Sequence, residues 1–119
     1  MMSEIKRLGL RMDTGEEAEI TKIADCLAAA IQPEKIYLFG STARGTATEG
    51  SDFDFYLVVD DAVGGDLVAL SQKAYRSLRG IRKHPVDIVI ASSTQYNDRK
   101  HLDTLEQVVD KEGRLLYGK

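Results

Sequence analysis

The sequence predicts an α+β fold, with helices packed on a small mixed β-sheet, and two observations support this prediction. Short segments rich in β-branched and aromatic side chains alternate with longer segments of helical periodicity. The 119 residues, of which 43% are hydrophobic and 29% charged, have the length and composition of one soluble domain. We therefore expect a single domain over 1–119, in which the weakly patterned residues 1–13 are flexible.

The first half of the chain contains one expected helix and two expected strands. Apolar side chains at helical spacing predict a helix over 16–31, and Pro33 ends it. The apolar segment KIYLF predicts a strand over 35–39. The composition then changes to Thr, Ala, Gly and Ser, which indicates a loop over 41–51 before a second strand over 53–60.

The second half continues the alternation of helices and strands. An aspartate that can cap a helix, followed by apolar residues on one side, predicts a helix over 66–78. The apolar run VDIVIA predicts a third strand over 86–91. Two helical pieces over 93–100 and 102–112 follow, and RLLY predicts a short edge strand over 114–117.

Charge and cysteine content exclude some function classes. A formal net charge of −3 argues against direct binding to nucleic acid, because proteins that coat nucleic acid carry a basic excess. Cys26 is the only cysteine, so an internal disulfide and a cysteine metal cluster are both excluded. Because no apolar run approaches a signal peptide or a membrane span, we expect a cytoplasmic protein that contacts no membrane.

Two aspartates at the start of the second expected strand form the first part of a candidate site. Asp52 and Asp54 are two residues apart, so their side chains point to the same face of the strand. Two carboxylates about 4 Å apart repel by roughly 1 kcal/mol in water, and by about 4 kcal/mol at an effective dielectric constant of about 20. A bound cation would remove this repulsion, and carboxylate oxygens favour Mg²⁺.

A third aspartate lies in the third expected strand. Asp87 has only apolar neighbours in VDIVIA, and a lone carboxylate in a strand buried on both faces would be costly. If this strand pairs with the strand over 53–60, Asp87 joins Asp52 and Asp54. Three carboxylates then fit two Mg²⁺ ions, an arrangement used for in-line displacement at phosphorus.

A glycine and a serine follow the first expected strand directly. Gly40 allows close approach of the backbone to a ligand, and the N–H groups after it can face an anion. Ser41 adds a hydroxyl donor, and Arg44 adds a positive charge. Phosphate is the anion that this turn suits, although a plain β-turn is the default explanation of a bare Gly-Ser.

These residues together resemble a known family. Gly40-Ser41, ten intervening residues and Asp52-Phe53-Asp54 are similar to the GS-x10-DxD signature of the DNA polymerase β-type nucleotidyltransferases. Asp87 stands where the third carboxylate of that superfamily would lie. The string LFGSTARG and the small size resemble the minimal nucleotidyltransferases, or MNT proteins, over roughly residues 16–117.

The resemblance implies the palm-like nucleotidyltransferase fold and transfer of a nucleoside monophosphate, usually AMP from ATP, to an acceptor. It implies that Asp52 and Asp54 hold the metal ions. Asp87 would bind the catalytic metal and help to deprotonate the acceptor hydroxyl. In the nucleotide-binding turn that begins at Gly40, Ser41 would contact the terminal phosphates and Arg44 would provide a further phosphate contact.

The resemblance also implies a partner. Many MNT proteins are encoded with a HEPN-domain toxin, which they neutralise, in some cases by adding AMP to a toxin tyrosine. Because this chain has room only for a catalytic core, we expect a partner protein to bring the acceptor. Two alternatives remain open, namely a non-catalytic antitoxin that acts by binding alone and a nucleotidyltransferase that modifies an aminoglycoside-like small molecule.

Other polar residues have simpler interpretations. The sequence contains a basic cluster, formed by Arg76, Arg79, Arg82 and Lys83. This cluster could contact phosphates or an acidic partner, but a solvated helix end is its simplest explanation. His84 and His101 have no ligand-like partners nearby in the sequence and are interpreted as surface residues. Tyr96 could belong to a helix or lie near a partner surface.

Overall fold

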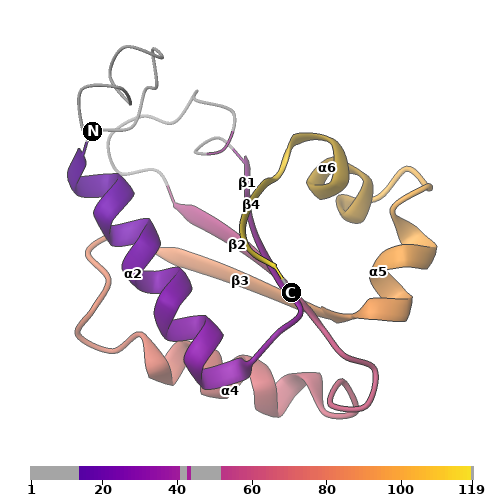
Figure 1. The fold of residues 1–119 in the computed structure, drawn as a ribbon, viewed down its shortest axis with the longest axis horizontal. Helices are drawn as coiled ribbons and strands as arrows, with labels where there is room; N and C mark the ends of the chain where they lie inside the picture. The colour runs from indigo at the N-terminus through magenta and orange to yellow at the C-terminus, as the bar shows by residue number, and fades with distance from the viewer. Residues whose placement is uncertain (1–13, 41–42, 44–51, 119) are drawn as a thin grey trace.

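The computed structural model describes residues 14–40, 43 and 52–118, in which four helices pack on a four-stranded sheet (Figure 1). In chain order the elements are α2 (Thr14–Ile31), β1 (Lys35–Phe39), β2 (Phe53–Val59), α4 (Leu67–Ser77), β3 (Val86–Ser92), α5 (Ser93–Arg99), α6 (Leu105–Glu112) and β4 (Arg114–Gly118). The predicted α+β fold is confirmed. The expectations for 1–13 and, apart from Ala43, for the loop over 41–51 lie outside the described residues.

The sheet is mixed, with the strand order β3-β2-β1-β4. β1 is antiparallel to both β2 and β4, whereas β2 and β3 are parallel. The C-terminal end of β1 and the N-terminal ends of β2 and β3 therefore lie side by side at the same end of the sheet. The strand predicted over 114–117 is indeed an edge strand, β4.

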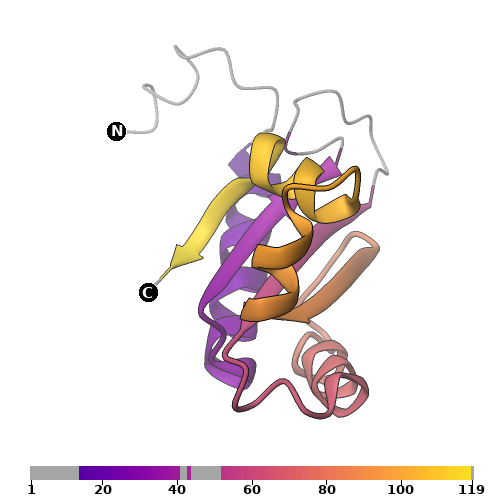
Figure 2. The ribbon, with the colours of Figure 1, turned by 90° about the vertical axis from the view of Figure 1, so that its right-hand side faces the viewer.

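The two faces of the sheet carry separate cores, because alternate side chains of a strand point to opposite faces. The larger core lies under α2 and α4 and includes Ile20, Leu27, Ile36, Phe55, Leu57 and Ala74. The smaller core lies under α5 and α6 and consists of Tyr56, Val58, Ala91, Tyr96 and Val109. Figures 1 and 2 show these helix pairs on opposite sides of the sheet. Each fully buried large side chain contributes about 1.5–3 kcal/mol to folding.

Side-chain caps define where the later helices begin. Asp66 caps α4 by accepting a hydrogen bond from the Ala69 N–H at 3.0 Å, as the sequence predicted. The last helix begins at Leu105 and not at 102, because the Thr104 hydroxyl accepts from the Gln107 N–H at 3.3 Å. The first helix begins at Thr14 and not at 16. None of the described helices combines the length and apolarity needed to cross a membrane.

Candidate active site

Two of the predicted site residues are direct neighbours across the parallel strands. In the β2–β3 register, Asp54 is the Cα partner of Asp87. Paired residues on adjacent strands lie about 4.8 Å apart with their side chains on one face. Asp52 precedes Asp54 by two residues and so lies beside the start of the same face. The prediction that the VDIVIA strand pairs with the strand of Asp54 is confirmed.

The carboxylates belong to the α5–α6 side of the sheet. Asp54 shares this face with Tyr56, two residues further along β2, and with Phe39, its antiparallel partner in β1. Asp52 and Asp87 are exposed and Asp54 is half-buried, so all three can be reached from solvent at this end of the sheet.

One argument from the sequence was wrong. The strand of Asp87 contributes to both cores, through Ile88 on one face and Ala91 on the other, but Asp87 itself is exposed near the start of β3. The burial of a lone carboxylate therefore gives no reason for a cation at this position. The reason that remains is the like charge of Asp54 on the adjacent strand.

Gly40 approaches the site from the end of β1. Its φ of +79° lies in the left-handed region, which L side chains rarely adopt. A Cβ at this position would also collide with Oδ2 of Asp54. Glycine is thus needed both for the backbone conformation and for the space that the Asp54 carboxylate occupies. The predicted approach of this backbone to a phosphate stays a prediction.

The other two residues of the predicted nucleotide-binding turn, Ser41 and Arg44, lie outside the described residues, and so their phosphate contacts stay predictions. Ala43 is described. It has a helical backbone conformation and packs against the larger core. The chain after Gly40 is therefore attached to the α2–α4 side of the sheet at this residue.

The donor set suits a hard divalent cation. Asp52, Asp54 and Asp87 offer only carboxylate oxygens, which are the protein ligands that Mg²⁺ takes together with water and phosphate oxygens. Within residues 14–40, 43 and 52–118, no three Asp, Glu, His or Cys side chains are grouped closely enough to hold a metal ion. Asp54 and Asp87 suit such an ion by their chemistry and strand register, whereas the centre of three carboxylates and two ions stays a prediction.

A buried carboxylate of α2 holds the segment that leads into β3. Glu19, which is 8% exposed, accepts hydrogen bonds from the backbone N–H groups of Lys83 at 2.6 Å and His84 at 2.9 Å. Its other oxygen lies 2.7 Å from Nδ1 of His84. Burial raises the pKa of Glu19, but these hydrogen bonds outweigh burial and hold the pKa below its ordinary value.

This network extends to β2, the strand that begins after Asp52 and carries Asp54. The His84 ring stacks on Phe53 with the ring centroids 4.6 Å apart, and the Phe53 N–H donates to the Pro85 carbonyl at 2.9 Å. Phe53 lies between Asp52 and Asp54 in the sequence, and its side chain is buried on the opposite face. The interpretation of His84 as a surface residue is wrong, since its side chain is 22% exposed and fixes the entry to β2 and β3.

A second polar network lies behind Asp54 on its own face. The Tyr56 hydroxyl donates to Oε2 of Glu106 at 2.6 Å, and Nε of Arg99 donates to Oε1 at 3.0 Å. Burial and the Glu106 carboxylate raise the pKa of Tyr56. Burial also raises the pKa of Glu106, but the hydrogen bonds from Tyr56 and Arg99 outweigh it and lower that pKa. Glu106 is therefore an anion that locks α5 and α6 to β2.

Aromatic rings complete this wall. The Tyr96 ring stacks on Tyr37 at 5.8 Å and is tilted against Tyr56 at 5.5 Å, and Phe39 meets Tyr56 edge-on at 6.4 Å. Tyr96 is 4% exposed, so of the two interpretations left open by the sequence the helical one is right. The carboxylates thus border a rigid surface.

Known proteins share these features. The family model described as a nucleotidyltransferase domain matches residues 20–116, which is most of the chain. The chain belongs to the nucleotidyltransferase domain family. This result confirms the resemblance seen in the sequence, and the parallel carboxylate pair is accordingly the candidate active site of a nucleotidyltransferase.

Two solved structures are similar to this nucleotidyltransferase. A candidate nucleotidyltransferase from Sulfolobus solfataricus shares 21% identity over 86% of this chain and 79% of that chain, with a TM-score of 0.60, which shows the common fold. A crystal structure of a mutant of the toxin–antitoxin MntA-HpeT shares 28% identity over 82% of this chain and 71% of that chain, with a TM-score of 0.55. Among curated proteins, none matches the chain.

Proposed function

We propose that this nucleotidyltransferase transfers AMP from ATP to a hydroxyl group of a partner protein. Asp52, Asp54 and Asp87 would hold the Mg²⁺ ions that this reaction requires. The observation that carries the proposal is the register of β2 and β3, which sets Asp54 beside Asp87 in a chain of this family. Such chemistry belongs in the cytoplasm, where ATP is available, as the sequence leads us to expect.

In the proposed reaction, the acceptor oxygen forms a bond to the α-phosphorus of ATP. The bond from that phosphorus to the oxygen bridging to the β-phosphate breaks, and pyrophosphate leaves. Asp87 would help to take the proton of the acceptor hydroxyl and would bind the catalytic metal, and Asp52 and Asp54 would also hold the metal ions. Bound Mg²⁺ would neutralise the charge that develops on the phosphate oxygens. Ser41 and Arg44, in the turn that follows Gly40, would hold the remaining phosphates.

For the partner we propose a HEPN-domain toxin, with this chain as its antitoxin. Support comes from the likeness to the toxin–antitoxin MntA-HpeT at 28% identity over 82% of this chain. A tyrosine hydroxyl of the toxin is the acceptor that this proposal requires. With such a partner, the small catalytic core needs no acceptor-binding domain of its own.

The decisive experiment uses ATP labelled at either the α- or the γ-phosphate, with Mg²⁺ and the protein encoded by the neighbouring gene. Label on the partner from the α-position alone is expected. Asp54→Asn should abolish this label, whereas the matched control Asp25→Asn, at an exposed position of α2, should keep it. Binding of Mn²⁺, followed by electron paramagnetic resonance, gives a second measure that needs no partner.

Other outcomes would favour the alternatives. Tight binding of the partner without any label would indicate an antitoxin that acts by contact alone. Label that appears on an aminoglycoside-like alcohol in the absence of a partner would indicate a small-molecule enzyme. Label from the γ-position would mean a kinase reaction and would contradict nucleotidyl transfer.

A further inference from the structure

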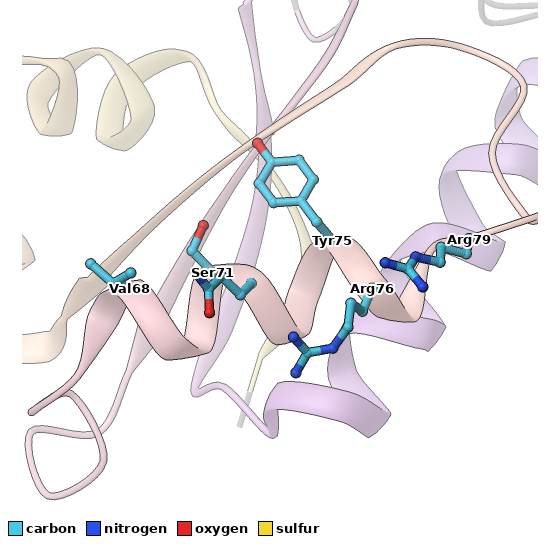
Figure 3. Close-up of a pocket in the computed structure, with 6 residues that line it drawn as sticks. Val68, Ser71, Tyr75, Arg76 and Arg79 are labelled. Atoms are coloured by element: carbon cyan, nitrogen blue, oxygen red, sulfur yellow. The ribbon is translucent and has the colours of Figure 1, made fainter.

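A groove with a volume of about 440 Å³ runs along the outer side of α4. Figure 3 labels side chains of α4 that line the groove, together with Arg79 just beyond the end of the helix. The residues that line this surface, called here the α4 groove, are Val68, Ser71, Gln72, Tyr75, Arg76 and Arg79. Their positions repeat at helical spacing, so they form one continuous stripe.

Two side chains give the α4 groove apolar surface, Val68 near the start of the helix and Tyr75 about two turns further along. Val68 is 69% exposed, the largest exposure among the large hydrophobic side chains of the described residues. The Tyr75 ring is 37% exposed, and its hydroxyl accepts a hydrogen bond from the Ile88 N–H of β3 at 2.9 Å. Figure 3 shows this ring pointing from the helix toward the strand. The ring is therefore fixed in place for contact with a partner.

The C-terminal end of the α4 groove is positively charged. Arg76 and Arg79 are exposed and form no ion pair in the part of the chain that the structure describes. By contrast, Arg99 is paired with Glu106, and Arg114 is paired with Glu17. In a chain of net charge −3, two unpaired guanidinium groups at one end of a groove are complementary to an acidic ligand.

The dimensions of the α4 groove indicate the form of this ligand. The eleven residues of α4, Leu67–Ser77, span about 16 Å, or three turns, and Arg79 lies just beyond the end of the helix. Pairing of a partner's β-strand with the free edge of β3 is disfavoured, because the Ile88 N–H already donates its hydrogen bond to the Tyr75 hydroxyl. A helix of about three turns can place carboxylates beside the two arginines and apolar side chains along the rest of the α4 groove.

We propose that the α4 groove binds an acidic amphipathic helix of a partner protein. Carboxylates of that helix would pair with Arg76 and Arg79, and its apolar side chains would cover Val68 and Tyr75. Because α4 packs on the opposite side of the sheet from Tyr56 and the carboxylate face, such a partner leaves the candidate active site open. The proposal does not depend on nucleotidyl transfer.

The test uses a fluorescein-labelled peptide of about 16 residues, designed as an amphipathic helix with Leu and Glu on one face. Fluorescence anisotropy measures its affinity for the full chain without ATP or Mg²⁺. Binding is expected to weaken at least tenfold in Arg76→Gln/Arg79→Gln and to weaken as salt is raised. The matched control Lys73→Gln/Lys111→Gln removes two positive charges from exposed positions outside the α4 groove and should bind within about twofold of the wild type.

The apolar surface of the α4 groove has its own control. Val68→Ser should weaken binding, whereas Val63→Ser, at another exposed valine that does not line the α4 groove, should not. Amide chemical-shift changes in the ¹⁵N-labelled protein should map to α4. The proposal is overturned if the peptide does not bind, if both charge pairs weaken binding equally, or if an oligonucleotide binds this surface and the acidic peptide does not.

Discussion

Replacing Gly40 by alanine should damage the candidate active site more than the fold. An L-residue at φ +79° costs about 1–2 kcal/mol, which lowers the melting temperature by about 4–8 °C for each kcal/mol. The new Cβ would collide with Oδ2 of Asp54, the mobile end of a side chain, so rotation of Asp54 relieves the contact at little further cost. The rotated carboxylate, however, no longer faces Asp87.

The functional loss should therefore be large. A displacement of about 1 Å in a catalytic group lowers a reaction rate by about 100-fold, and we expect a loss of that size in AMP transfer from α-labelled ATP. Mn²⁺ affinity, measured by electron paramagnetic resonance, should fall in parallel. Thermal unfolding of the same sample measures the effect on stability.

The matched control is Gly80→Ala. Gly80 has nearly the same φ, +77°, but an added Cβ would meet no atom within 4 Å. This variant should lose roughly the same 1–2 kcal/mol of unfolding free energy but should keep its metal affinity and transfer activity. If the two variants are equally active, the close approach of Gly40 to Asp54 has no functional consequence and the reasoning fails.

Three further substitutions test the networks around the site. Glu19→Gln should lower the free energy of unfolding at pH 7 by about 2–3 kcal/mol, because a charged acceptor of several hydrogen bonds is lost. Since the folded pKa of Glu19 lies below its ordinary value of 4.5, its contribution is present above that pH and is lost as the pH falls through the folded pKa. Urea unfolding should therefore show that the variant loses less unfolding free energy between pH 7 and pH 3 than the wild type does, and equal losses would contradict this. Tyr56→Phe should destabilise by about 1–3 kcal/mol, because the buried Glu106 loses its 2.6 Å hydrogen bond, and a calorimetric change near zero would contradict this. Arg114→Ala should lower the free energy of unfolding by less than about 1 kcal/mol in the same measurement, because its ion pair with Glu17 is partly exposed. A much larger loss would refute the interpretation of this pair as a weak surface ion pair.

The convergence of the aspartates could be predicted because it follows from local rules. A spacing of two residues places Asp52 and Asp54 on one face of a strand, and an apolar run such as VDIVIA is recognisable as a strand by itself. Only the adjacency of the two strands had to be assumed, and the register with Asp54 opposite Asp87 confirms it.

The supporting networks could not be predicted, because their partners are distant in the sequence. Glu19 and His84 are 65 residues apart, and nothing near His84 indicates a carboxylate. Tyr56 and Glu106 are 50 residues apart and meet only after α6 packs on the second face of the sheet. The exposure of Asp87 was missed because the apolar pattern of VDIVIA does not show which of its residues are covered by helices.

The parallel pairing of β2 and β3 has a consequence for the newly made chain. Neighbouring parallel strands need a crossover, here through α4, and such long-range closure forms more slowly than a hairpin. Until this closure is complete, Asp54 and Asp87 are far apart and the candidate active site is not assembled. A ligand that contacts both strands will bind only chains in which β2 and β3 have paired, and it will stabilise these chains by mass action. Binding of such a ligand therefore indicates that the chain has reached the correct topology.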